Sequence, residues 1–356
     1  MGTNPFAQAR APRDERTYAA ARERWAQVAK PVGSLGYLEE AISRICALEG
    51  TLDISLAHKC MAVVCADNGV VAQGVSASTA EVTRIVARNV AEGTSSINRM
   101  CAVANVDVFA YDLGMIEPLD HPKMDNRRIR AATADISSGP AMDRAEALRA
   151  IETGIEIACE LKGAGYEVIG TGEVGIGNTT TSTAVASLLL GKDPRDLSGA
   201  GAGLDEAGRS HKADIIEQAI RVNSPDPSDP IDVLAKVGGL DLCCLAGICL
   251  CAAQAKIPVV LDGIISGAAA LAAFRMDITS VNAMIPSHLS EEPAASFILD
   301  SLGLVPVIHA GMRLGEGTGA SAMMPLLDMA LAVFQTAATF ESSGIRLNDY
   351  DPKALT

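Results

Sequence analysis

The chain has 356 residues, of which 49% are apolar and only 3% aromatic, so it can form one large domain, or one large and one small, around a core of small side chains. Its 29 basic and 43 acidic residues give a net charge of −14, and no basic patch with interleaved aromatics is present, which argues against nucleic acid as a partner. The nine cysteines form no paired CxxC motif, so we expect reduced thiols and no bound metal.

The polar N-terminus lacks the apolar segment of a secretory signal. The longest apolar helix candidate, residues 240–255, is shorter than the ~20 residues that a membrane span needs. We therefore expect a cytoplasmic protein without a membrane partner.

Residues 12–50 have the pattern of amphipathic helices interrupted at residues 30–33. From residue 57 onward, short apolar runs alternate with helical stretches. The pattern predicts strands over residues 60–66, 106–111, 167–170, 257–261, 281–285 and 305–310. It predicts helices over residues 145–162, 180–190, 205–221, 230–255, 292–302 and 324–343.

Strands that are apolar throughout and separated by helices predict an α/β fold with a doubly wound, Rossmann-like, mostly parallel sheet. We expect the two ends of the chain, residues 1–50 and 324–356, to form a small helical domain. Residues 51–323 would form the large α/β domain. Polar or glycine-rich loops follow all six predicted strands, and ligands of such sheets bind at the carboxyl ends of the strands. The sequence thus predicts one active-site cleft.

The segment GEVGIGNTT, residues 172–180, places three glycines before Asn178, Thr179, Thr180 and a helix. Glycines allow close backbone approach, and a helix N-terminus offers free N–H groups to a phosphate. The segment is neither a Walker A sequence nor GxGxxG. From spacing alone, phosphate binding and a purely structural turn remain open.

The segment SGAGAGLDEAGRSHK, residues 198–212, is a second glycine-rich loop that opens a helix. Lys212, about two turns into that helix, can be a solvated helix residue. With two glycine-rich loops in an acidic protein, it is also a candidate counter-charge for phosphate.

The segment RLGEGTGA, residues 313–320, surrounds one carboxylate, Glu316, with glycine and alanine. Desolvation on such tight backbone would raise the pKa of Glu316 toward that of a general base. An exposed turn glutamate is the alternative. His288, which follows a predicted strand, has either a catalytic role or a structural hydrogen bond.

Taken together, these blocks resemble the nicotinate-nucleotide–dimethylbenzimidazole phosphoribosyltransferase family of cobamide lower-base activation, or its phenol-activating relatives. The resemblance runs from KPVGSLGYLEE at residues 30–40, through ADNGVVAQGVSA (66–77), GTSSIN (93–98), GAGLDEAG (201–208), VLDGIISGAAAL (260–271) and SHLSEEP (287–293), to RLGEGTGA. It implies transfer of the phosphoribosyl group of nicotinate mononucleotide to an azole or phenol, without a metal or redox cofactor, by a homodimer or a heterodimer with a paralogue.

The resemblance also implies roles for single residues. Glu316 would be the catalytic base, and Lys212 with the two glycine-rich loops would hold the phosphate. The full set implied to bind substrate is Ser76, Glu173, Val174, Gly175, Gly177, Asn178, Thr179, Thr180, Gly201, Gly203, Lys212, Asp262, Ser287, Arg313, Leu314, Gly315, Gly317, Thr318 and Gly319.

The chain departs from the family pattern at a few positions near the implied acceptor pocket. Asn68 stands where the family usually has histidine, residues 78–80 replace a Pro-Gln pair, and Val174 replaces methionine. These departures leave open the acceptor and the pairing of subunits. A non-catalytic partner subunit is the alternative function, and a dehydrogenase is disfavoured because no GxGxxG follows a first strand.

Overall fold

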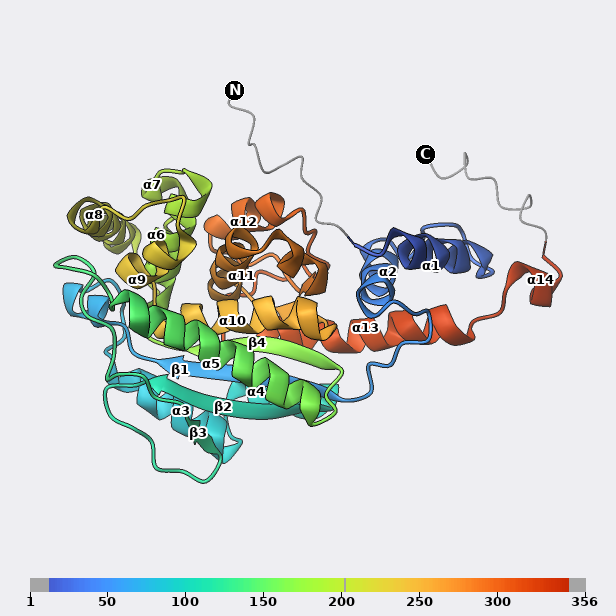
Figure 1. Ribbon diagram of the computed structural model, residues 1–356, viewed down its shortest axis with the longest axis horizontal. Helices are drawn as coiled ribbons and strands as arrows, with labels where there is room; N and C mark the ends of the chain where they lie inside the picture. Colours follow the sequence, from blue (N-terminus) through green and yellow to red (C-terminus); the bar gives the residue numbers. More distant parts are fainter. Residues whose placement is uncertain (1–12, 202, 346–356) are drawn as a thin grey trace.

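The computed structural model describes residues 13–201 and 203–345. Its centre is a parallel sheet of six strands in the order β3-β2-β1-β4-β5-β6, the order of Rossmann folds (Figure 1). The strands are β1 Lys59–Ala66, β2 Val106–Gly114, β3 Met124–Asn126, β4 Val168–Val174, β5 Val259–Leu261 and β6 Met284–Pro286. The predicted fold class is confirmed.

Strand β1 explains why the central strands are apolar throughout. Every residue of β1 is buried, and alternate side chains belong to different cores. Cys60, Ala62 and Val64 pack into the core on one face, whereas the side chains of Met61 and Val63 pack into the core on the other. A strand covered on both faces has no solvent-facing position for polar residues.

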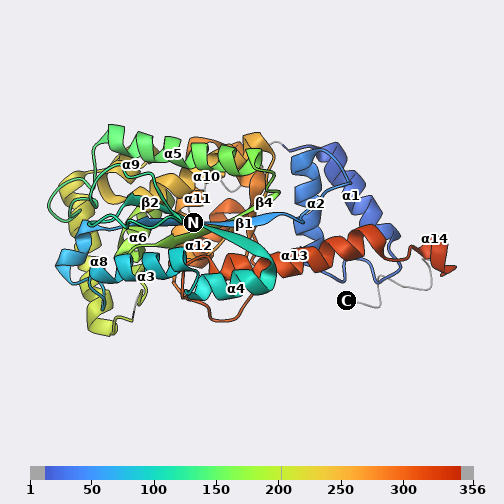
Figure 2. The same ribbon diagram turned by 90° about the horizontal axis from the view of Figure 1, so that it is seen from below.

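Helices cover both faces of the sheet (Figures 1 and 2). One face carries α5 Arg144–Gly163, α6 Asn178–Leu190, α8 Glu206–Asn223, α9 Pro230–Val237, α10 Leu240–Ala255, α11 Ile264–Met276 and α12 Ala294–Leu302. The other carries α3 Glu81–Glu92, α4 Ser96–Ala104 and α13 Thr318–Thr336. Shorter elements are η1 Gly69–Gln73, α7 Pro194–Leu197 and η2 Ile278–Ala283.

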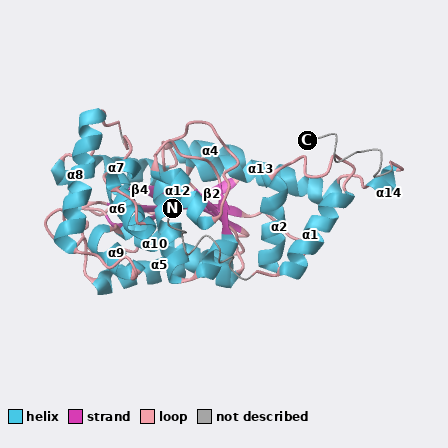
Figure 3. Cartoon of the chain, turned by 90° about the horizontal axis from the view of Figure 1, so that it is seen from above, coloured by secondary structure: helices cyan, strands magenta, loops and turns pink. Residues whose placement is uncertain are grey.

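Helices from both chain ends meet at one end of the molecule. There α1 Glu15–Gln27 and α2 Tyr37–Glu49 lie beside the distal half of α13, with α14 Phe340–Ser343 beyond it (Figures 1 and 3). Trp25 of α1 contacts Phe334 of α13, with ring centroids 5.0 Å apart. Helix α13 runs unbroken across residue 324, and the core of these helices continues onto the sheet. The division into residues 1–50 plus 324–356 and residues 51–323 stays a prediction, and its extreme ends lie outside the described residues.

The sequence prediction was wrong for some elements. Residues 305–310 form no strand but only an isolated bridge between Ile308 and His288. Pro306 explains this, since it lacks an N–H group and restricts the residue before it. The helix predicted over residues 230–255 is two helices, separated at Gly238 and Gly239.

Other boundaries moved, and one strand was missed. Residues 278–283 form the 3₁₀ turn η2 before the short strand β6, whereas a strand was predicted over 281–285. The edge strand β3 lacks the apolar run on which strand prediction depends, because Asp125 and Asn126 are exposed. No described helix is long and apolar enough to cross a membrane.

Candidate functional site

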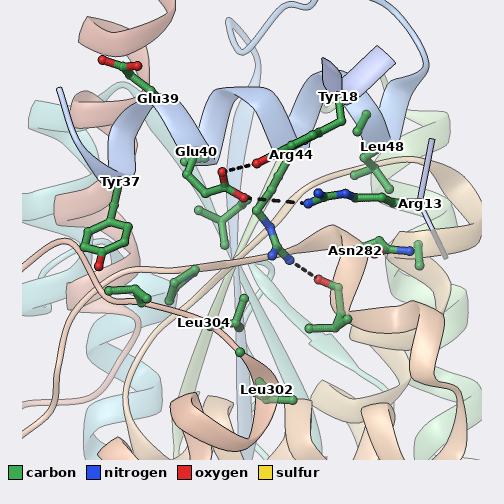
Figure 4. A pocket seen from close by; sticks show the side chains of 18 of the residues that line it. Arg13, Tyr18, Tyr37, Glu39, Glu40, Arg44, Leu48, Asn282, Leu302 and Leu304 are labelled. Carbon is green, nitrogen blue, oxygen red and sulfur yellow. Dashed lines mark hydrogen bonds and ion pairs between the residues drawn. The ribbon is translucent and has the colours of Figure 1, made fainter. Parts of the chain in front are cut away.

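Two cavities could hold a ligand, and they lie in different parts of the fold. The larger, about 1040 Å³, lies between α2, η2 and residues 300–307. In Figure 4, Arg44 extends from α2 across this cavity, where its Nη2 donates to the carbonyl oxygen of Val281 at 2.6 Å. None of the residues predicted for the site lines this cavity.

The smaller cavity, about 180 Å³, lies where the carboxyl ends of β4 and β5 meet the N-termini of α6 and α11. Thirteen of the twenty predicted site residues line it: Ser76, Glu173, Val174, Gly175, Gly177, Asn178, Thr179, Gly201, Asp262, Arg313, Leu314, Gly315 and Glu316. We take it as the candidate site, because the chemistry-bearing loops converge here and not on the larger cavity.

Glu316 stands on an unusual turn immediately before α13. Its φ is +60°, a left-handed value that is uncommon for a residue other than glycine, and Gly315 and Gly317 on either side have φ of +84° and +94°. Gly172 of β4 lies against this turn, because a Cβ there would be 2.5 Å from the carbonyl oxygen of Glu316. The turn therefore needs glycine both within it and beside it.

The carboxylate of Glu316 accepts a hydrogen bond from the amide N–H of Ile97 at 3.2 Å, in the first turn of α4. Burial raises the pKa of Glu316, the hydrogen bond from Ile97 lowers it, and the charge of Asp262 raises it, with an upward net shift. Glu316 is half-buried on the cavity wall. It thus has the position and shifted pKa of a general base.

Helix α6 lines another polar part of the cavity, and α8 lies behind it. The N-cap of α6 is Gly177, and no side chain caps this helix. Nearby, Lys212 of α8 is fully buried, and its Nζ donates to the Thr179 hydroxyl at 3.0 Å. Among the described residues, no carboxylate forms an ion pair with Lys212, and burial lowers its pKa to about 8. The charge of Glu292 partly offsets this effect. An uncapped helix N-terminus beside a buried cation without a close ion pair is suited to a phosphate.

Two buried carboxyl groups, those of Glu173 and Asp241, lie near the turn that carries Glu316. Glu173 accepts a short hydrogen bond from Nδ2 of Asn178, which also donates to Asp241 at 3.1 Å. Burial, followed by the charge of Asp241, raises the pKa of Glu173 to about 8, whereas burial raises that of Asp241 to about 6. Burial and the neighbouring carboxylate thus favour the protonated form of Glu173.

Seven predicted site residues do not line the cavity. Gly317, Thr318 and Gly319 lie behind Glu316 in the start of α13, where the N–H groups of both glycines donate to Asp262. Buried Ser287 contacts His288 and accepts two backbone N–H groups at its carbonyl oxygen. The remaining three are Thr180, which is buried in α6, Gly203, and Lys212 behind Thr179.

Sequence reasoning missed several residues around the site. Ile97 was not singled out, although its block GTSSIN was part of the resemblance. Glu292 lines the cavity and accepts from the Gly201 amide at 2.8 Å, so it fixes the second glycine-rich loop. The block SHLSEEP was the available signal for Glu292. His288, for which the sequence left a catalytic and a structural role open, lines the cavity too, and its Nδ1 is 3.0 Å from the Ser287 hydroxyl.

The described residues contain no group of three or more His, Cys, Asp or Glu that could hold a metal ion. Arg313 reaches the cavity mouth, where it forms an ion pair with Glu291. Asn68, buried at the end of β1, lies beside Thr181, and its Nδ2 has no hydrogen-bond partner among the described residues.

Comparison with known proteins shows which family this chain is similar to. A phosphoribosyltransferase family profile matches residues 11–345. The nicotinate-nucleotide–dimethylbenzimidazole phosphoribosyltransferase of Ruminiclostridium cellulolyticum is 44% identical over 94% of this chain and 95% of its own length. The enzyme of the same name from Acetivibrio thermocellus is 41% identical over 92% of both chains. The crystal structure of CobT from Thermus thermophilus superposes with a TM-score of 0.88 at 38% identity, covering 93% of this chain and 99% of that one.

Proposed function

The chain belongs to the nicotinate-nucleotide–dimethylbenzimidazole phosphoribosyltransferase family, and we propose that it performs that reaction. It transfers the 5-phosphoribosyl group of nicotinate mononucleotide to a lower-ligand base, giving an α-ribosyl phosphate and nicotinate for cobamide synthesis. Dimethylbenzimidazole is the acceptor that we propose first, because it is named in these relatives. A related azole or a phenol is the alternative acceptor.

One observation carries the proposal: a single cavity has a half-buried carboxylate, Glu316, on its wall and an uncapped helix N-terminus at α6, and the buried ammonium of Lys212 lies behind the cavity-lining Thr179. The ammonium and the N-terminus of α6 would bind the phosphate, so the ribose would extend from there toward Glu316. The acceptor base would then lie between the ribose and the carboxylate.

The chemistry requires one base and no acid. In the mononucleotide, the ring nitrogen of nicotinate carries positive charge, so it departs with the electrons of the glycosidic bond and needs no proton. The incoming azole forms a bond from nitrogen to the anomeric carbon and loses its N–H proton to Glu316. Such base catalysis contributes about 10²–10⁴-fold, and positioning within the cavity supplies much of the rest.

Protonated Glu173 supports the same arrangement. Its carboxyl oxygen lies against Gly315, because a Cβ on that glycine would be 2.8 Å from Oε1. Because burial favours the neutral form of Glu173, a second negative charge beside Glu316 is disfavoured. We propose that Glu173 donates a hydrogen bond to the bound substrate.

A non-catalytic partner subunit is not favoured. The chain keeps Glu316, Lys212 and both glycine-rich loops, and it is similar to proteins named as enzymes over nearly their whole length. The departures at Asn68 and residues 78–80 concern the choice of acceptor in this proposal, because Ser76 lines the cavity close to them in sequence.

The test is a product assay. Purified protein is incubated with nicotinate mononucleotide and each of a panel of azoles and phenols, and nicotinate and the ribosyl phosphate are separated by chromatography. We expect equal amounts of both products with dimethylbenzimidazole or another member of the panel. If the nucleotide binds in calorimetry but no acceptor releases nicotinate, the enzymatic proposal is wrong.

We also propose that two chains assemble, either as a homodimer or as a heterodimer with a paralogue. Leu314 at the cavity mouth and Ile85 on α3 are each 56% exposed, and a second chain would cover such apolar side chains. Light scattering of the protein alone and mixed with a paralogue tests this.

The nine cysteines are free thiols, which supports a cytoplasmic location.

A further inference from the structure

We propose that Asp262 is a positioning residue: its carboxylate fixes the turn that carries Glu316, and it acts on the reaction through Glu316 rather than by binding substrate. The inference rests on the proposed function, because it assigns a task to a residue of the same site. It replaces the expectation from the sequence that Asp262 contacts substrate.

The carboxylate of Asp262 is occupied by backbone donors. Its Oδ2 accepts from the amide of Gly317 at 3.1 Å, and its Oδ1 accepts from the amides of Gly319 at 2.7 Å and Ala320 at 3.3 Å. Asp262 is itself anchored to the sheet, since its amide donates to the hydroxyl of Thr171, which donates to the carbonyl oxygen of Val260. The sheet and the start of α13 are thereby joined through one side chain.

These contacts complete a helix end that lacks a cap of its own. The N-cap of α13 is Gly317, which has no side chain, and the first amides of a helix have no partner within the helix. Asp262, more than fifty residues earlier in the chain, supplies the capping oxygens that a local Asp or Ser usually provides. Its negative charge also interacts favourably with the positive end of the helix dipole.

Glu316 depends on this cap because of its backbone. Residues 315, 316 and 317 all have left-handed φ values, and such a backbone persists only when its surroundings over-determine it. Asp262 binds the residue immediately after Glu316 and two more in the next turn. Loss of these three hydrogen bonds would allow the turn to relax, which moves the carboxylate away from the amide of Ile97 and from the acceptor.

The competing view is direct contact with substrate, since Asp262 also lines the cavity. The two views differ in kinetics. A residue that binds the nucleotide affects its KM, whereas a residue that positions the base affects kcat and has no effect once the base is gone.

The experiment is a double-mutant cycle of Asp262→Asn with Glu316→Gln in the full-length protein. For Asp262→Asn alone, we expect kcat to fall at least tenfold and the KM for nicotinate mononucleotide to change less than threefold. In the Glu316→Gln background, measured at high enzyme concentration, Asp262→Asn should change the residual rate less than twofold. A tenfold rise in KM at unchanged kcat, or the same fold loss in both backgrounds, would overturn the inference.

Two further variants keep the test decisive. Thr171→Val removes the hydroxyl that holds Asp262 and is the milder substitute if Asp262→Asn does not fold; we expect a smaller loss of kcat that is likewise absent in the Glu316→Gln background. Asp143→Asn removes a capping carboxylate from α5, far from the cavity, and should leave kcat unchanged. Wild-type protein that releases no nicotinate contradicts the proposed function, whereas active wild type with an equally active Asp262→Asn variant contradicts only this inference.

Discussion

Replacing Lys212 with methionine should weaken nucleotide binding and, at the same time, stabilise the fold. Methionine keeps the unbranched shape and most of the length of the buried side chain but removes its charge. A hydrogen bond to a charged group contributes about 1.5–3 kcal/mol, so loss of the contact to phosphate should raise the KM for nicotinate mononucleotide roughly 10–150-fold. The value of kcat at saturating nucleotide should change little, because Lys212 lies behind Thr179 and away from Glu316.

The gain in stability follows from the pKa of the buried ammonium. Burial lowers it from 10.5 to about 8, and at 1.36 kcal/mol per pKa unit the charged lysine costs the folded state about 3 kcal/mol at pH 7. The lost hydrogen bond to Thr179 returns about 1 kcal/mol of that, so the net gain is about 2 kcal/mol. For a chain of 356 residues, this raises Tm by roughly 3 °C.

The sign of this effect depends on pH in a defined window. Below the folded-state pKa of about 8, the lysine is charged in both states and its desolvation penalty is fully present. As pH rises from about 8 toward 10.5, the unfolded chain binds more protons than the folded one, so wild-type stability increases. The advantage of Lys212→Met should therefore be largest at pH 8 or below and be lost before pH 10.5, where the missing hydrogen bond to Thr179 makes the variant the less stable protein.

The assays are steady-state nicotinate release and thermal unfolding with and without nucleotide, with Lys123→Met, which changes an exposed lysine, as the matched control. The nucleotide should raise Tm much more for wild type and for the control than for Lys212→Met. A KM within twofold of wild type, or a lower Tm without ligand, would refute the role of Lys212 as counter-charge.

Three further predictions concern the turn around the base. Glu316→Gln should lower kcat about 10²–10⁴-fold with folding intact, whereas Glu341→Gln on the exposed α14 should not. Burial raises the pKa of Glu316 above 4.5, and only its carboxylate form accepts a proton, so kcat should fall on the acid side with a midpoint above 4.5. On the alkaline side, the KM for the nucleotide should rise above about pH 8, because Lys212 loses its proton there. Gly319→Ala should lower both kcat and stability, the latter by about 1–3 kcal/mol in urea unfolding, since a Cβ there would overlap the ring of His288; Gly139→Ala, with no atom within 4 Å, should change neither.

The elements that the sequence predicted well depend on local patterns. Strand β1 is almost entirely apolar because it is buried on both faces, and such a run can be recognised without knowledge of its neighbours. Prediction was wrong where a local rule competed with the apolar pattern. Pro306 prevents a regular strand over residues 305–310, and two glycines separate α9 from α10.

The candidate site divides in the same way. Its glycine-rich loops, Glu316 and Lys212 could be found from the sequence, because residue types and order along the chain are what a resemblance compares. The sequence does not reveal which oxygen accepts a hydrogen bond from each N–H group. Gly317 and Gly319 were therefore assigned to substrate, although in the structure their N–H groups donate to Asp262.

The sequence by itself therefore determined the fold class and the chemical groups that meet at the carboxyl ends of the strands. Only the tertiary structure decided how the base is held, by the amide of Ile97 on its carboxylate and by Asp262 on the helix behind it, and that Lys212 is buried against Thr179. The physical reason is that hydrogen bonding and desolvation act between atoms that folding brings together. In this site, the interacting residues are separated by up to 219 positions along the chain.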